Sequence, residues 1–106
     1  TVRVAGAISH AVVKTPAPGD YRVQPHHGGR SDPREVSPDL RDLWDRLVTV
    51  LPGKPMYGRV DTVSINGRPH VMELELIEPS LFLRHEPKAA DRLADAIVQR
   101  IELQTR

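Results

Sequence analysis

Three carboxylates in the stretch from Tyr57 to Leu83 have the types and spacing of a metal site. Glu73 and Glu75 are two residues apart, so a β-strand would direct both side chains to the same face. Asp61 lies an even number of residues from each, and it shares their face if the loop between two strands has an odd length. Like charges that face one another across strands are destabilising, so a cation is expected between them. Oxygen-only ligands suit Mg²⁺ best, and the alternative is a hairpin whose acids face water.

A β-hairpin is the element that must position these acids. Residues 57–65 alternate and are rich in β-branched side chains, Asn66-Gly67 has the chemistry of a hairpin turn, and residues 70–77 form a second run. The sequence therefore predicts two antiparallel strands that carry the acids.

The same residues resemble the metal-binding end of the ATP-grasp ligases, in particular the glutathione synthetase-like branch. In that family an Asp on one strand is followed by Glu-x-Asn on the next strand, and then by a short segment that ends in Ser-Pro. Asp61 matches the Asp and Glu73 matches the Glu. Glu75 stands where the family usually has Asn, and Glu78-Pro79 stands in place of Ser-Pro.

The resemblance extends toward the start of the chain. In the family, a strand with a basic residue is followed by Gly-Asp or Gly-Glu, an Arg, a polar residue and Gly-Gly. Taken alone, the basic residues would be solvated surface groups and the glycines simple loop residues. The matching residues here are Lys14, Gly19-Asp20, Arg22, Gln24 and Gly28-Gly29.

A loop of about residues 24–36 has the composition of a mobile lid, with glycines and basic groups near an anionic ligand. It contains His26-His27, but adjacent histidines on a loop without further ligands at usable spacing are a weak indication of metal binding. Lid closure over a ligand is the role that the resemblance implies for this loop.

The resemblance implies the C-terminal lobe of an ATP-grasp fold over essentially the whole chain. The implied enzyme is an ATP- and Mg²⁺-dependent (or Mn²⁺-dependent) carboxylate–amine ligase, in which ATP phosphorylates a carboxylate and an amine displaces the phosphate. Arg22 would be catalytic and stabilise the acyl phosphate. The remaining implied site residues are Asp61, Glu73 and Glu75 for the metal, and Lys14, Arg22, Gln24, Gly28 and Gly29 for ATP or substrate.

Two helices complete the predicted α+β fold, an antiparallel sheet with helices packed against it. The first spans residues 37–51, with Ser37 as N-cap, Pro38 at the first helical position and Pro52-Gly53 as the stop. The last helix opens at Pro87. Its predicted buried stripe consists of Ala90, Leu93, Ala94, Ile97, Val98 and Ile101.

Composition narrows the function classes. The chain has 106 residues and a net charge of +1, which gives no indication of a nucleic-acid or membrane surface. It has no cysteine, which excludes disulfides, thiolate zinc sites and cysteine nucleophiles. A cytoplasmic protein is the default expectation, with small-molecule carboxylate and amine substrates and a possible homo-oligomer. The strand-like opening at Thr1, without Met, suggests a piece of a larger ATP-grasp domain, whose remainder would be its partner. The rival interpretation is a non-catalytic lobe used for binding or assembly.

Overall fold

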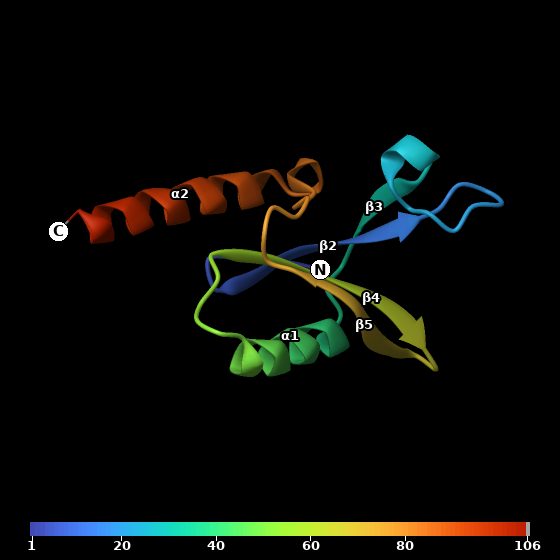
Figure 1. The fold of residues 1–106 in the computed structure, drawn as a ribbon, viewed down its shortest axis with the longest axis horizontal. Coiled ribbons are helices and arrows are strands. Elements are labelled where there is room, and N and C mark those ends of the chain that lie inside the picture. Colours follow the sequence, from blue (N-terminus) through green and yellow to red (C-terminus); the bar gives the residue numbers. More distant parts are fainter. Residues whose placement is uncertain (106) are drawn as a thin grey trace.

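A single antiparallel sheet with the strand order β3-β2-β1-β4-β5 forms the centre of the protein in a computed structural model that describes residues 1–105. Helices α1 and α2 lie on opposite sides of this sheet (Figure 1). The predicted α+β class is confirmed. The elements are β1 (Val2–Val4), β2 (Ala7–Thr15), the 3-10 turn η1 (Pro25–His27), β3 (Arg30–Arg34), α1 (Pro38–Val50), β4 (Tyr57–Ile65), β5 (Arg68–Glu75), the 3-10 turn η2 (Leu83–His85) and α2 (Pro87–Gln104).

Helix α1 begins where the sequence predicts. The side-chain oxygen of Ser37 accepts a hydrogen bond from the backbone nitrogen of Leu40 at 3.3 Å, which satisfies one of the free donors of the first turn. Pro38 occupies the start of the helix, where its missing N–H costs nothing, and Asp39 lies at the positive end of the helix dipole. The helix ends at Val50, just before Pro52 and Gly53.

The apolar cluster around Trp44 lies between α1 and the sheet, while Val2 and Val4 are buried on the opposite face. Trp44 is 1% exposed, and Gly58 on β4 makes room for it, because a Cβ there would lie 3.3 Å from its Cη2 atom. A side chain at this position would push the indole away from the strand. The residues that pack in this cluster are Leu43, Trp44 and Val60, with Ile8, Leu40, Leu47 and Leu74 around them.

The β4–β5 hairpin closes through the predicted turn. Asn66 and Gly67 have φ values of 52° and 76°, the left-handed pair that a two-residue type I′ turn requires. Near the turn Ile65 pairs with Arg68, so the loop between the two strands has two residues, an even number. With that register continued, Asp61 would face Met72.

A β-bulge at Met72 changes this register. Thr62 pairs with Val71, whereas Asp61 pairs with Glu73, so Met72 is the additional residue on β5. The bulge therefore supplies the odd offset that the loop does not, and it places Glu73 on the same side of the sheet as Asp61. Val60 then pairs with Leu74, which packs against the Trp44 cluster. Without the bulge, β5 would turn its acids toward α1 and its leucine away from it.

A second bulge, on β2, likewise changes which face of the sheet the side chains of that strand point to. Val2 pairs with His10 but Arg3 pairs with Ile8, so Ser9 is the additional residue. Ile8 packs against the core, whereas His10 and Lys14 turn to the opposite side, where Asp61 lies. The two bulges thus direct Ile8 and Leu74 toward α1 and place His10, Lys14 and Glu73 on the opposite face, which Arg59 shares with the buried Val2 and Val4.

The structure differs from the predicted elements at three places. Residues 30–34, expected within a lid loop over residues 24–36, form β3 and pair with residues 11–15 of β2. The first hairpin turns at Ala5 and Gly6, whose φ values are 52° and 83°, and not at Gly6-Ala7. Pro33 and the charged residues of β3 suit an edge strand, which hides this strand from a search for apolar alternation.

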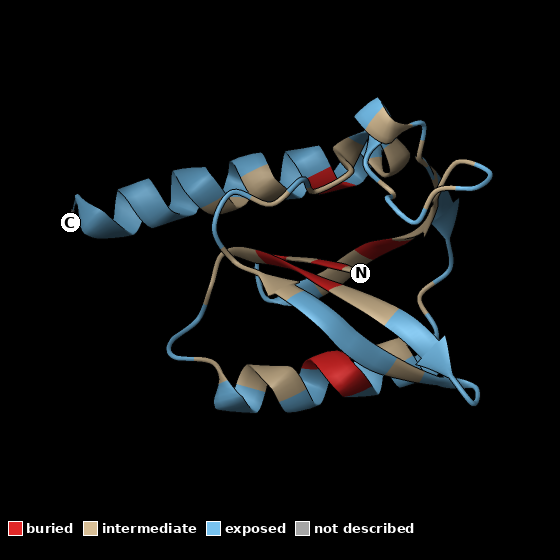
Figure 2. Ribbon diagram, turned by 45° about the vertical axis from the view of Figure 1, so that its right-hand side comes forward, coloured by how far each residue is buried: buried red, intermediate tan, exposed pale blue. Residues whose placement is uncertain are grey.

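The predicted buried stripe of α2 is wrong. Only Ala89 is buried, while Ile97, Val98 and Ile101 are 43%, 53% and 55% exposed. Figure 2 shows that burial is confined to the centre of the sheet, part of α1 and the start of α2, and that the rest of α2 is exposed. The helix projects beyond the sheet, so periodicity correctly predicts the helix but not its burial. Neither helix within residues 1–105 has the length and apolar content needed to cross a membrane.

Candidate functional site

The buried side chain of Arg59 is the centre of a charged cluster on the sheet face opposite α1. Its Nε and Nη2 atoms donate to Oδ1 and Oδ2 of Asp61 at 2.8 and 3.1 Å, a bidentate pair. The two side chains are 9% and 10% exposed. Since Arg59 and Asp61 are two residues apart on β4, the strand period directs both to the same face. A buried bidentate pair of this kind holds the carboxylate in one orientation.

Lys14 joins the cluster from β2. Its Nζ atom lies 2.5 Å from Oδ2 of Asp61, and its side chain is 25% exposed. Lys14 and Asp61 are 47 positions apart in the chain, and the sequence resemblance assigned both to the site. Asp61 thus accepts hydrogen bonds from two cations on different strands.

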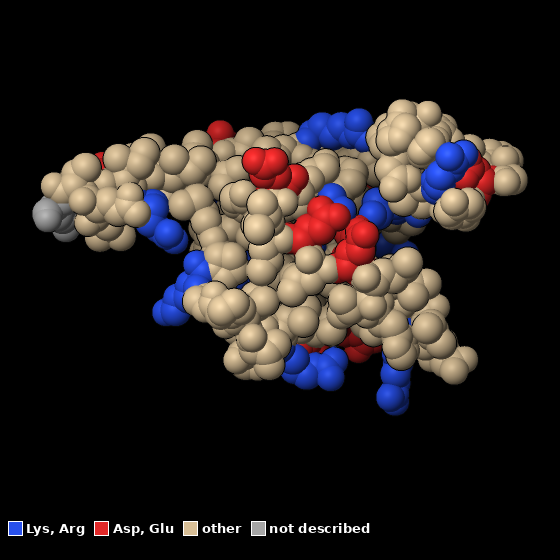
Figure 3. Space-filling view, in the orientation of Figure 1, with Lys and Arg blue, Asp and Glu red and all other residues tan. Residues whose placement is uncertain are grey.

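The other two acids lie beside this pair on β5. Oε1 of Glu75 is 3.2 Å from Nη2 of Arg59. The two residues are paired directly across β4 and β5. Glu73 is opposite Asp61 and exposed. Figure 3 shows acidic side chains gathered beside basic ones near the middle of the molecule.

The cations control the charge of Asp61. Burial alone would raise its pKa, but the hydrogen bonds from Arg59 and Lys14 outweigh burial and hold the pKa of Asp61 below its ordinary value. The carboxylate is therefore ionised at neutral pH, as a metal ligand or an ion-pair partner must be.

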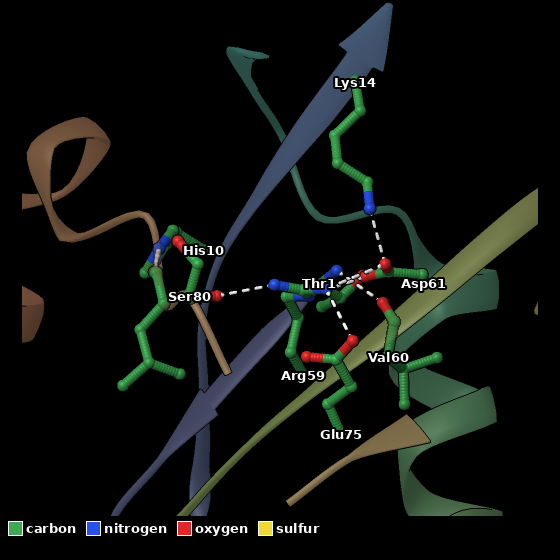
Figure 4. A network of polar contacts seen from close by, with 9 residues as sticks. Thr1, His10, Lys14, Arg59, Val60, Asp61, Glu75 and Ser80 are labelled. Carbon is green, nitrogen blue, oxygen red and sulfur yellow. Dashed lines mark hydrogen bonds and ion pairs between the residues drawn. The ribbon is translucent and has the colours of Figure 1, made fainter. Parts of the chain in front are cut away.

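The segment between β5 and α2, residues 76–86, closes over Arg59 and is called the connecting segment below. Nη1 of Arg59 donates to the backbone oxygen of Ser80 at 2.9 Å, and the guanidinium carbon lies 5.5 Å from the centre of the Phe82 ring. Figure 4 shows the guanidinium between Ser80 on one side and Asp61 and Glu75 on the other. Glu78 and Phe82 have φ values of 54° and 51°, a left-handed backbone that is unusual for side chains of this size.

His10 fastens the same segment to β2. Its Nε2 atom donates to the oxygen of Leu81 at 2.8 Å, so in the neutral ring Nδ1 accepts from the hydroxyl of Ser9 at 2.7 Å, and Oγ of Ser9 accepts in turn from Arg92. His10 is 7% exposed, and burial lowers the pKa of its imidazole, against the opposing effect of the hydrogen bond to Leu81. The imidazole is therefore neutral at pH 7 and positions Leu81, next to the two residues that contact Arg59.

The acids offer the right donor chemistry for Mg²⁺, since all three supply carboxylate oxygens and share one face. Asp61 already accepts from Arg59 and Lys14, while Glu75 accepts from Arg59 alone. Among residues 1–105, no three His, Cys, Asp or Glu side chains are close enough together to hold an ion. The carboxylate oxygens are donors of the kind that Mg²⁺ prefers, but their arrangement does not form a metal site, because Arg59 pairs with both Asp61 and Glu75.

Arg22 lies in the loop that follows β2, apart from this cluster. Its Nε and Nη2 atoms donate to Oδ1 and Oδ2 of Asp20 at 3.1 and 2.9 Å, and its side chain is 46% exposed. Within the described residues, the hydrogen bonds and ion pairs of its side chain go to Asp20 alone. The structure thus brings Lys14 to the acids but leaves Arg22 outside.

The glycine pair and Gln24 shape the loop rather than leave it open. The oxygen of Gln24 accepts from the nitrogens of His27 and Gly29 at 2.9 and 3.2 Å. A Cβ on Gly29 would lie 2.1 Å from the oxygen of Val23, a distance that no side chain tolerates. Gly28 adopts a φ of 78° at the end of η1. These glycines are required for a tightly folded loop.

Arg59 and His10 were not predicted from the sequence. Arg59 was detectable, because it lies two residues before Asp61 on the same strand and must share its face. The sheet face to which the side chain of His10 points depends on the bulge at Ser9, which the sequence pattern does not reveal.

Comparisons of the chain with protein-family models, with curated proteins and with solved structures gave no match. The assignment of function therefore depends on the residues and their geometry.

Proposed function

We propose that this chain is the metal-binding C-terminal lobe of an ATP- and Mg²⁺-dependent carboxylate–amine ligase of the ATP-grasp type. What carries the proposal is the direct contact of Lys14 with Asp61, two residues that the family motif selects independently at 47 positions apart. Glu73, which matches the family's Glu, and Glu75, which stands where the family usually has Asn, lie on the same sheet face as Asp61.

In this proposal, Asp61, Glu73 and Glu75 hold the metal, which neutralises phosphate charge during phosphoryl transfer. Lys14 adds a positive charge beside the phosphates. The chain would supply carboxylate oxygens of these acids as ligands, and phosphate oxygens and water would complete the coordination.

Arg22 is assigned to the acyl phosphate. A guanidinium offers planar paired donors that match phosphate or carboxylate oxygens, as it does toward Asp20. An acyl phosphate bound beside the loop would compete with Asp20 for these donors. Gln24, Gly28 and Gly29 hold the loop in which Arg22 lies.

ATP-dependent phosphate release tests this function. The natural protein that contains this sequence is incubated with ATP, Mg²⁺ and a panel of amino-acid and peptide carboxylates, each with and without an amine acceptor. Release that requires both carboxylate and amine supports the ligase. Release that is absent throughout, in a protein that binds Mg²⁺, contradicts it.

A second candidate is a non-catalytic module for binding or assembly, to which the remainder of an ATP-grasp domain or a second copy would dock. The observation that favours it is the pairing of Asp61 with both Lys14 and Arg59, which neutralises this carboxylate without a metal. In that case Mg²⁺ would not change the stability of the protein, whereas a ligand of the folded state raises it.

A further inference from the structure

A groove lies between the connecting segment and the turn η1. Its volume is about 450 Å³, within the range of pockets that hold small ligands. Its walls are mostly apolar, and the guanidinium of Arg84 is the charged group among the side chains that line it. The apolar lining consists of Pro25 from η1 and of Pro79, Leu81, Phe82 and Leu83 from the connecting segment.

The connecting segment is held in place before any ligand arrives. Arg59 on β4 donates to the oxygen of Ser80, and His10 on β2 fixes the next residue in the same way. Phe82 keeps a left-handed backbone with a φ of 51°, a conformation that persists for a large side chain only where neighbouring contacts impose it. The groove is therefore preformed, which reduces the cost of ordering it around a ligand.

Arg84 is held at this groove without a counter-charge. Its Nη2 atom donates to the hydroxyl oxygen of Ser31 on β3 at 2.7 Å, and its Nε atom donates to Nε2 of His85 at 3.3 Å. Neither partner brings a negative charge, and within the described residues no carboxylate forms an ion pair with Arg84. Neither bond uses the Nη1 atom, which can therefore donate to an anion.

We propose that this groove binds a small carboxylic acid with an apolar body, whose carboxylate pairs with Arg84 while the body lies along the apolar walls. The walls favour a hydrocarbon body, because burying it removes apolar surface from water. The guanidinium favours a carboxylate, to which it donates charge-assisted hydrogen bonds, and it repels a cationic head group. Recognition of this kind needs neither ATP nor a metal ion, so it goes beyond the proposed ligase activity and does not rest on it.

A chemical-shift titration of the isotope-labelled protein, without ATP or metal ions, tests this binding. The probes are phenylpropionate, phenylpropanol and phenylpropylamine, which share one apolar body and differ in the charge of the head group. Phenylpropionate should shift the amide signals of residues 80–85 in a saturable manner. The alcohol should bind about tenfold more weakly, the scale of one lost charge-assisted hydrogen bond, and the amine more weakly still.

Two variants assign the preference to one side chain. In Arg84→Gln the acid and the alcohol should bind within about twofold of each other, because the charge that distinguishes them is gone. This side chain is exposed, so its replacement should leave the fold intact. The matched control is Arg41→Gln, which removes an exposed arginine from α1, on the other side of the sheet. It should keep the tenfold preference of the wild-type protein.

Several results would overturn the proposal. It is wrong if phenylpropionate gives no saturable shift in residues 80–85, if the wild-type protein binds the acid and the alcohol equally, or if Arg84→Gln keeps the preference that Arg41→Gln shows. A hydrophobic tripeptide with a free C-terminal carboxylate is the remaining probe. Binding of this peptide in the groove without binding of the small acid would assign the groove to a peptide terminus instead. Because ATP and Mg²⁺ are absent from these titrations, failure of the phosphate-release assay would leave their result unchanged.

Discussion

Replacing Asp61 with Asn should destabilise the protein by about 3 kcal/mol at pH 7. Removing one partner of a buried ion pair costs about 3–5 kcal/mol, because the other charge is stranded. Here Arg59 is 9% exposed and would lose its bidentate partner, but it keeps Glu75, and Lys14 is exposed enough to reach water. We therefore expect the lower end of that range, equivalent to a fall in Tm of about 12–24 °C for a domain of this size.

The single tryptophan provides the assay. Trp44 is buried in the core, so its fluorescence reports unfolding in urea without a label. Asp32→Asn is the matched control, since Asp32 pairs with Arg30 at 3.2 Å with side chains 58% and 74% exposed. Such an exposed pair contributes at most about 0.5 kcal/mol. A loss in Asp61→Asn that is no larger than the loss in Asp32→Asn would refute the account of the buried cluster.

The pH dependence gives an independent check on the same carboxylate. Because the pKa of Asp61 is lower in the folded than in the unfolded protein, its contribution is complete above the unfolded pKa of about 4 and is lost as the pH falls through the folded value. The stability difference between wild type and Asp61→Asn should therefore shrink below about pH 4. A difference that stays constant down to pH 2 would show that the carboxylate's ionisation does not stabilise the fold.

Three further predictions concern residues around the cluster. Burial lowers the pKa of His10 in the folded protein, so as the pH falls the imidazole is protonated in the unfolded chain before it is protonated in the folded one. The urea midpoint of the wild-type protein should therefore fall as the pH drops below about 6.5, and the fall should be smaller in His10→Gln. Gly29→Ala should destabilise the loop, because its Cβ would lie 2.1 Å from the oxygen of Val23, and faster amide exchange in residues 22–30 would reveal it. If the natural protein is a ligase, Arg22→Lys should lower turnover about 100-fold or more with ATP affinity nearly unchanged. Near-wild-type turnover would show that Arg22 is a surface arginine without a catalytic role.

The sequence was sufficient where local chemistry decides the structure. Helix α1 follows from a capping serine, a proline at its start and an apolar stripe that packs on the sheet. The β4–β5 turn follows from Asn66-Gly67, whose left-handed backbone the type I′ turn requires.

The sequence was insufficient where tertiary packing decides. The common face of Asp61 and Glu73 depends on the bulge at Met72, which is selected because it returns Leu74 to the core and is not marked by any residue of special backbone preference. The exposed apolar face of α2 depends on how far the sheet extends beneath it, which the helix's own periodicity cannot report. The role of Arg59 required the register, the connecting segment and the burial together.

Metal binding by the facing acids is the central claim, and a Mn²⁺ titration of three proteins tests it most directly. The proteins are wild type, Glu73→Gln and the control Glu102→Gln, which removes an exposed acid from α2. The account predicts saturable binding in wild type and control, and at least about a tenfold loss of affinity in Glu73→Gln. Equal affinity in all three proteins would contradict it and leave Asp61, Glu73 and Glu75 as ion-pair partners and solvated acids.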